Sequence, residues 1–316
     1  MDRGSQPLIS LAGGILVASD SRGVAFVSSN GEIRHRADVG APAVAPAVTP
    51  DDDLVLVTLG GQVLLLDFEG RVLRRSHTEQ PVFSQLLVLG DGVAVWASGQ
   101  GLLLGVDVTD FSIAFREIFP VGGTAYPVEY ASEGLLVVTN TAGMLRRVPQ
   151  PMTWMASSVT FRGPSAVAND GTLWGVADDG VVASVNPQSG AAVRARATTH
   201  TGVAPLLVSD GSMRILGAHE VTATDSRGNS IWTYQDATNR VVDGIVDNDG
   251  KTVIVEVTPA FTGVLACLDA SGNLLWSTPF QDRPAEDPPT LTDDGVIALL
   301  AVNRQSGNTF EVLGFR

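Results

Sequence analysis

The stretch ACLDASGNLLWSTPF, residues 266–280, decides the fold. A short apolar run ends at Asp269, the chain turns through Ser-Gly-Asn, and a second apolar run leads to Trp276. An Asp in this place can accept hydrogen bonds from backbone N–H groups of the turn, and Gly272 can adopt the positive φ that a tight turn needs. We therefore expect two β-strands joined by a turn. A second copy, TATDSRGNSIWTY, fills residues 222–234, so the unit repeats.

A turn signal, usually Asp-Gly, recurs along the whole chain at intervals of about 40 residues. The turns are Gly13-Gly14, Asp51-Asp52-Asp53, Asp91-Gly92, Glu133-Gly134, Asp170-Gly171, Asp210-Gly211, Asp249-Gly250 and Asp294-Gly295. The runs between them, such as LVLVTL and TVIVEV, are typical of short strands, and no segment keeps a helical period. The sequence therefore predicts an all-β fold: an eight-bladed β-propeller of four-stranded antiparallel blades, forming a single domain over residues 1–316.

The last repeat is incomplete. The chain stops at Arg316, where the repeat would place its Asp, so we expect the last blade to lack its fourth strand within the chain. Three explanations remain open: residues 1–6 close the blade, the blade has three strands, or an upstream native segment supplies the strand. We favour the upstream segment, which would make this chain part of a larger protein or assembly, behind a leader, a lipid anchor or another domain.

The aromatic residue that follows the Asp-x-x-Gly turn has a structural interpretation. A Trp at the start of the outer strand places a large flat ring where it can cover a neighbouring blade. Trp232 and Trp276 take this position in the two close copies, and Trp154 takes it in an irregular repeat. The residues that we predict to dock the blades are Asp67, Asp225, Gly228, Trp232, Asp269, Gly272, Trp276 and Trp154.

The segments CLDASGNLLW and ATDSRGNSIW resemble the PQQ-like repeat, the tryptophan-docking unit of quinoprotein propellers, and LDFEGRVLR and VNPQSGAAVR match it in part. Families that share this repeat include quinoprotein alcohol dehydrogenases, the BamB lipoproteins of outer-membrane assembly and sensor propellers of bacterial kinases. The resemblance implies eight blades and a bacterial protein outside the cytoplasm, in the periplasm or on the cell surface. It leaves the activity open, because a fold does not carry a function.

The resemblance also defines what a quinoprotein enzyme would need. Those enzymes use a disulfide between adjacent cysteines over the cofactor, and a Ca²⁺ ion held beside an Asp base. This chain has one cysteine, Cys267, so the disulfide cannot form, and no acidic position matches the metal or base motif. We therefore expect no cofactor, no metal and no catalytic residue. The P-loop-like Gly250-Lys251-Thr252 and the calcium-loop-like DNDG at 247–250 are interpreted as hairpin turns.

Composition excludes other classes of protein. The chain has 316 residues, 44% of them hydrophobic, and a formal net charge of -14, with Lys251 as its only lysine. A nucleic-acid binder needs a basic face, so we expect no nucleic-acid partner. No run approaches the ~18 apolar residues of a membrane span, and the first ten residues do not form a signal peptide.

Three segments depart from the repeat and are candidates for a protein-interaction surface: residues 146–163, 258–263 and 280–290. The first is rich in Met and Trp, the second is an enlarged hairpin, and the third is an acidic, Pro-rich connection. Simple alternatives are core filling, a lone exposed Phe and a solvated spacer, respectively. The candidate residues are Met152, Met155, Phe261, Asp282, Arg283, Glu286 and Asp287.

Three functions remain in view. The first is a monomeric, non-catalytic scaffold that binds a protein or peptide through one face of the propeller. The second is a ligand-sensing domain with a small molecule or sugar at the central channel, where inner strands such as VAPAVT carry small residues. The third is an enzyme with Asp and Arg chemistry at the channel mouth. It is the weakest, because only four histidines and one lysine are present to move protons.

Overall fold

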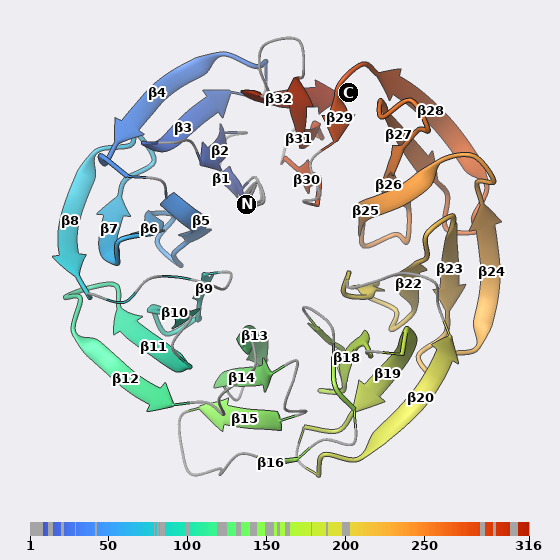
Figure 1. The fold of residues 1–316 in the computed structure, drawn as a ribbon, viewed down its shortest axis with the longest axis horizontal. Coiled ribbons are helices and arrows are strands. Elements are labelled where there is room, and N and C mark those ends of the chain that lie inside the picture. The colour runs from blue at the N-terminus through green and yellow to red at the C-terminus, as the bar shows by residue number, and fades with distance from the viewer. Residues whose placement is uncertain are drawn as a thin grey trace. The chain divides into compact units, whose positions relative to one another are not determined.

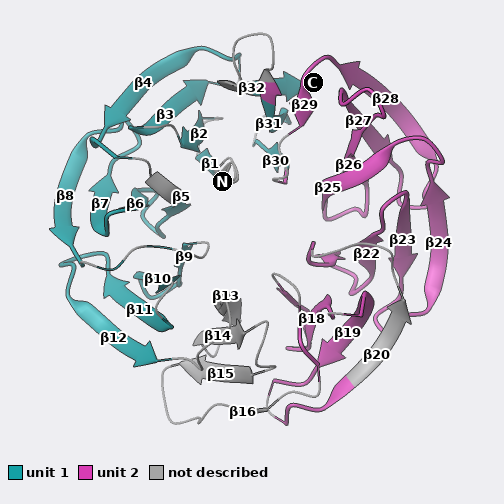
Figure 2. Ribbon diagram, viewed as in Figure 1, with its two compact units in different colours: residues 1–127, 289–301, 310–316 teal, residues 128–288, 302–309 magenta. Residues whose placement is uncertain are grey.

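The computed structural model describes residues 9–11, 15–19, 22–28, 30–41, 43–78, 80, 82, 86–98, 101–118, 125–130, 134–139, 144–148, 155–156, 159–161, 165–177, 179–187, 189–197, 203–284, 288–292, 295–303 and 309–315. The chain forms two compact units (Figure 2). The first contains residues 1–127, 289–301 and 310–316, and the second contains residues 128–288 and 302–309. That the chain is a single domain stays a prediction.

The first unit holds three sheets in which strands that are consecutive in sequence are also neighbours (Figure 1). Adjacent strands are antiparallel, as short turns between them require. The strands are β1 (Ile9–Leu11), β2 (Ile15–Ser19), β3 (Gly23–Ser28), β4 (Ile33–Asp38), β5 (Ala43–Val48), β6 (Leu54–Thr58), β7 (Gln62–Leu66), β8 (Val72–His77), β9 (Leu87–Val88), β10 (Val93–Ser98), β11 (Leu102–Asp107) and β12 (Ile113–Ile118).

Four further sheets have the same order, the first of them beginning at the end of the first unit. The strands are β13 (Ala125–Tyr130), β14 (Gly134–Thr139), β15 (Met144–Val148), β16 (Met155–Ala156), β17 (Ala166–Val167), β18 (Leu173–Val176), β19 (Val181–Val185), β20 (Ala192–Ala197), β21 (Leu206–Leu207), β22 (Met213–Leu216), β23 (Glu220–Thr224), β24 (Ser230–Gln235), β25 (Arg240–Val246), β26 (Thr252–Val257), β27 (Gly263–Leu268) and β28 (Leu274–Phe280). The predicted propeller of four-stranded antiparallel blades is confirmed.

The predicted number of blades is wrong: seven sheets have the order of a propeller blade, not eight. The remaining strands are β29 (Arg283–Pro284), β30 (Thr290–Leu291), β31 (Ile297–Asn303) and β32 (Thr309–Phe315). They form a sheet of order β29-β31-β30, with β32 beside β31. The physical reason is that β29, which lies in the irregular segment 280–290, pairs with β31, so β31 is no longer flanked only by its neighbours in sequence. The sheet gains its fourth strand from β29 instead, whereas we expected it to lack one.

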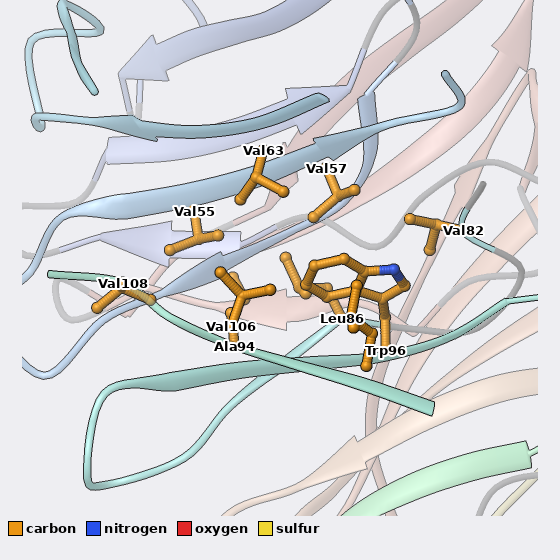
Figure 3. Close-up of a cluster of buried hydrophobic side chains, with 11 residues drawn as sticks. Val55, Val57, Val63, Val82, Leu86, Ala94, Trp96, Val106 and Val108 are labelled. Atoms are coloured by element: carbon orange, nitrogen blue, oxygen red, sulfur yellow. The ribbon is translucent and has the colours of Figure 1, made fainter. Parts of the chain in front are cut away.

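The core lies between blades, because the middle strands of a blade are buried on both faces. All five residues of β6 are buried. Side chains alternate between the two faces of a strand, so Leu54 and Leu56 pack with the cluster around Phe26, whereas Val55 and Val57 pack with the cluster around Trp96. Figure 3 shows the Trp96 cluster, which joins strands of two neighbouring blades. This double burial explains the nearly continuous apolar runs of the sequence.

The outer strands have a different character. In β28 every residue from Leu274 to Pro279 is exposed, and in β4 only Ala37 of six residues is buried. The outer strands lie largely toward water, so they carry more polar and charged side chains than the middle strands do. The outer strands therefore add little to the core.

Candidate functional site

The blades β21–β24 and β25–β28 of the second unit meet through one face of β26. Side chains at alternate positions of β26, namely Thr252, Ile254 and Glu256, point toward the preceding blade. They divide the interface into three layers: a buried arginine at one end, an apolar middle and a buried carboxyl group at the other end. The apolar middle contains Leu216, Val221, Val241, Ile254, Ala266 and Leu268, with Trp232 and Tyr234 packed against it.

Arg214 joins the two blades at the first end of this interface. The residue is 3% exposed, and its guanidinium donates to the Gly250 carbonyl (3.1 Å) and the Thr252 hydroxyl (3.3 Å) of the next blade. It also lies over the Trp232 ring, 5.1 Å from the centroid. Burial lowers the pKa of Arg214, and nearby Asp210 opposes this shift. The group stays charged, because an arginine pKa starts far above neutrality, and its donors find neutral oxygens.

The Asp-x-x-Gly turn supplies the surface on which Trp232 lies. Asp269 Oδ1 accepts hydrogen bonds from the N–H groups of Ser271 (2.8 Å) and Asn273 (2.9 Å), and Gly272 has a φ of 85°. A Cβ added to Gly272 would stand 2.6 Å from the Trp232 ring, so the ring rests directly on the glycine backbone. The Trp232 Nε1–H donates to the Ala270 carbonyl at 2.8 Å.

The other residues that we predicted to dock blades occupy related positions. Asp225 accepts from the N–H groups of Arg227 and Asn229, and Gly228 has a φ of 84°. Asp67 does the same for Glu69 and Arg71 and also pairs with the Arg71 guanidinium at 2.6 Å. Asn229 Nδ2 also donates to Asp225 Oδ2 at 2.8 Å, and this bond, followed by the backbone ones, lowers the pKa of Asp225. At Asp67 burial acts in the opposite direction, but the hydrogen bonds from Arg71 and Glu69 outweigh it and lower the pKa. Trp276 is 38% exposed, unlike a ring covered by a neighbouring turn, and Trp154 lies outside the described residues.

Glu256 forms the opposite end of the interface. The residue is 1% exposed, and its Oε1 has no hydrogen-bond partner among the described residues. Its Oε2 receives only a long hydrogen bond, 3.4 Å, from Asn239 Nδ2. The same nitrogen donates to Asp236 Oδ2 at 3.0 Å, so one amide group lies between two carboxyl groups. Burial, followed by the Asp236 charge, raises the pKa of Glu256 to about 7.

The charge that acts on Glu256 is the negative charge of Asp236. Asp236 Oδ1 also accepts hydrogen bonds from the backbone N–H groups of Thr238 (2.7 Å) and Asn239 (2.9 Å). Tyr234 lies nearby, and its pKa is raised to about 12 by burial and then by the charges of Glu256 and Asp236. Two carboxyl groups close together favour one proton between them. With its raised pKa, Glu256 is the carboxyl group that holds a proton up to near neutral pH.

Two of the three irregular segments meet in the structure. The hairpin between β26 and β27 and the segment after β28 lie at the same end of the blade, since strand direction alternates. Their residues Phe261 and Arg283 are in contact, with the Arg283 guanidinium 5.9 Å from the centroid of the Phe261 ring. Phe261 is 53% exposed, and Asp282 and Arg283 are half-buried. We call this end of the two blades, with the loop 236–239, the Phe261 face.

Phe261 is held in an unusual conformation. Its φ is 61°, in the left-handed region that a bulky residue adopts at a cost of about 1–2 kcal/mol. The turn is fixed by hydrogen bonds from the Phe261 N–H to the Thr258 carbonyl (2.9 Å) and between the hydroxyl groups of Thr258 and Thr262 (2.8 Å). Phe111 has the same φ, but its ring packs against the Trp96 cluster. Burial can offset the strain at Phe111, whereas Phe261 is half-exposed.

The other predicted surface residues are only partly placed. Met155 begins the short strand β16, for which the structure describes the backbone alone. Met152, Glu286 and Asp287 lie outside the described residues. Sequence reasoning missed Glu256, Asp236 and Asn239. A charged residue inside the apolar run TVIVEV was the signal that pointed to Glu256.

The described part of the chain offers no metal centre: no group of three or more His, Cys, Asp and Glu residues in it is placed to hold an ion. It also contains no helix that is long and apolar enough to cross a membrane. The Phe261 face instead combines an exposed aromatic ring, a guanidinium and a loop with polar side chains. Such a mixture suits recognition by contact and hydrogen bonding.

Comparison with known proteins agrees with the fold. Residues 217–313 match the family model of the outer membrane protein assembly factor BamB. The crystal structure of BamB from Moraxella catarrhalis superimposes with a TM-score of 0.68 at 14% identity, covering 98% of this chain and 94% of that one. No curated protein matches the chain. The protein is therefore a β-propeller with PQQ-like repeats that resembles BamB.

Two other solved structures share the architecture. The C-terminal WD40 domain of Sif2 has a TM-score of 0.74 at 12% identity and covers 99% of this chain and 97% of its own. The computationally designed Ika8 protein has a TM-score of 0.71 at 12% identity, with 100% and 98% covered. Proteins this dissimilar in sequence share the fold alone, so the function must be argued from the surface.

Proposed function

We propose that the protein is a non-catalytic binding scaffold, and that a protein or peptide partner binds to the Phe261 face. The observation that carries this proposal is the conformation of Phe261. A strained backbone around an exposed aromatic ring is stable only because the turn fixes it, and such strain gathers at functional sites. Folding alone gains little from this arrangement, whereas a partner that covers the ring would gain substantially.

The neighbouring groups support the same proposal. Arg283 stacks on Phe261, and aromatic residues and arginines are the side chains most enriched in the energetic centres of protein interfaces. The loop of Asp236 and Asn239 adds hydrogen-bonding groups beside them, as in the polar rim of an interface. The resemblance to BamB, which is named as an assembly factor, also supports a scaffold outside the cytoplasm that acts in a larger assembly.

The proposal can be tested by site-specific photo-crosslinking in cells of the source organism. A photoreactive phenylalanine analogue replaces Phe261 in one strain and Ser271 in a matched strain. Ser271 is exposed and lies in the turn at the opposite end of β27. We expect an adduct with a defined protein from position 261 only, and competition by added wild-type protein but not by the Phe261→Gly variant. Equal adducts at both positions, or no adduct at 261, would contradict the proposal.

A further inference from the structure

We propose that the loop 236–239 is a proton-controlled latch on the Phe261 face: it is closed while Glu256 carries a proton and opens when Glu256 loses it. The proposal rests on the proposed function only in assigning this loop to a binding face. The physical argument concerns a carboxyl group that the fold buries beneath the loop, with one oxygen left without a hydrogen bond.

The two neighbouring carboxyl groups, Asp236 and Glu256, make the loop sensitive to pH. Asn239 Nδ2 is within hydrogen-bond distance of both Asp236 Oδ2 (3.0 Å) and Glu256 Oε2 (3.4 Å), and it cannot satisfy two ionised groups equally. With a proton, Glu256 is neutral, and its burial costs much less free energy than burial of the ionised group. Without it, an ionised carboxylate stands in an apolar interface, next to the Asp236 charge and with an unsatisfied oxygen. The ionised form is therefore stabilised by any movement that admits water to Glu256.

Glu256 forms no ion pair in the described part of the chain. Groups that titrate or carry charge on the elements packed around it are of mixed sign. They are Tyr234 on β24, Asp236 on the loop, Arg240 and Asp243 on β25, Cys267 at the far end of β27, Glu220 on β23, His219 on the adjoining connection and Arg283 on β29. Among them, the Asp236 charge is the one that raises the pKa of Glu256, after burial.

The loop is the part of the structure that can yield. Ala237 and Thr238 are exposed and add nothing to the apolar middle of the interface. The loop is fastened at its two ends by backbone hydrogen bonds of 2.9 Å, from the Asp236 N–H to the His219 carbonyl and from the Val241 N–H to the Ala218 carbonyl. The His219 ring adds a hydrogen bond from Nδ1 to the Asn239 carbonyl at 2.7 Å. Breaking these contacts opens the loop locally and leaves the paired strands of the blade in place.

The pH range over which the loop opens follows from the burial of Glu256. Burial and the Asp236 charge raise its pKa to about 7 while the loop is closed, and opening would return it toward the ordinary value of 4.5. Linkage then makes the opening equilibrium rise by about 30-fold between about pH 5.5 and about pH 8.5. The opening equilibrium thus rises with pH up to about pH 7 and levels off above it.

Hydrogen exchange of the full chain tests the latch without any partner. We would compare wild type with Glu256→Gln at each pH, so that intrinsic exchange rates cancel, and follow the amides of Asp236, Thr238, Asn239 and Val241. We expect the wild-type to variant ratio of exchange rates to rise about 30-fold over this range. The matched variant Glu32→Gln, at an exposed carboxylate, is expected to behave as wild type.

Three outcomes would overturn the proposal. One is a ratio that stays constant with pH. Another is a ratio that rises equally at the paired strand residues Val255 and Leu265, which indicates global unfolding in place of a latch. The third needs no variant: the carboxyl carbon of Glu256 in the wild-type protein, followed by NMR, titrates at the ordinary glutamate value. Since no partner takes part, these results leave the proposed binding function to be judged by its own crosslinking experiment.

Discussion

Replacing Gly272 by Ala tests how the blades are docked. Gly272 has a φ of 85°, and its added Cβ would stand 2.6 Å from two atoms of the Trp232 ring. The substitution therefore acts twice: it strains the backbone and displaces the ring from the turn. Gly31 separates the two effects, because it has a φ of 87° in an equivalent turn and a Cβ there would meet nothing within 4 Å.

The expected magnitudes follow from these contacts. Gly31→Ala costs the left-handed strain of about 1–2 kcal/mol, less a gain of about 0.4–1 kcal/mol from a less flexible unfolded chain, so about 1 kcal/mol in all. Gly272→Ala adds the loss of the hydrogen bond from Trp232 to Ala270, about 1 kcal/mol, and of the ring contacts with Arg214 and the turn, about 1 kcal/mol more. We expect a total of about 3 kcal/mol.

Urea unfolding of wild type and both variants, followed by circular dichroism, measures these costs. The account predicts that Gly272→Ala destabilises the protein by about 2 kcal/mol more than Gly31→Ala, a difference that comes from the displaced Trp232. Equal costs for the two variants would show that the ring contributes nothing to docking, and the reasoning about the Asp-x-x-Gly turn would be refuted.

Three further predictions concern the second unit. Because the folded-state pKa of Glu256 is raised from 4.5 to about 7, its favourable contribution is complete below about pH 4.5 and is lost as the pH rises through about 7. Glu256→Gln should therefore gain about 3 kcal/mol over wild type between pH 4 and pH 8 in urea unfolding, and a pH-independent difference would contradict this. Phe261→Gly should be about 1 kcal/mol more stable than Phe261→Ala, since glycine relieves the positive φ. Ala260→Gly in the same turn should instead cost about 0.5–1 kcal/mol, and urea unfolding that finds glycine favoured over alanine at both positions, or at neither, would contradict strain at Phe261. Arg214→Lys keeps the charge but loses the planar donors that reach Gly250 and Thr252, and should cost about 2 kcal/mol in the thermal unfolding free energy; an unchanged midpoint would exclude the inter-blade role.

The repeat pattern predicted most of the fold. The turn at Asp269 and Gly272, with the Trp that follows, predicted strands, turns and four-stranded blades, because local hydrogen bonding and glycine conformation fix these features. The number of blades could not be read in the same way. The turn signal at Asp294-Gly295 looks like the others. The strand order of the last sheet depends on the pairing of β29 with β31, past β30, and β29 is a two-residue strand that the repeat pattern does not mark.

The candidate site was only partly predictable. Phe261 and Arg283 were each singled out as parts of irregular segments, and the rule that alternate connections share one end of a blade could have joined them. Glu256 was missed because an apolar strand with one charged residue usually places that residue at the surface. Here both faces of β26 are covered, so the carboxyl group has no exposed side to occupy.

The central claim is that the Phe261 face binds a protein partner, and an affinity measurement tests it most directly. The partner captured at position 261 would be titrated calorimetrically into wild type, Phe261→Gly and the opposite-end variant Ser271→Ala. The account predicts that Phe261→Gly weakens binding by at least about tenfold, or about 1.4 kcal/mol, with its thermal stability retained, and that Ser271→Ala binds as wild type does. Equal affinity of wild type and a folded Phe261→Gly would contradict the account.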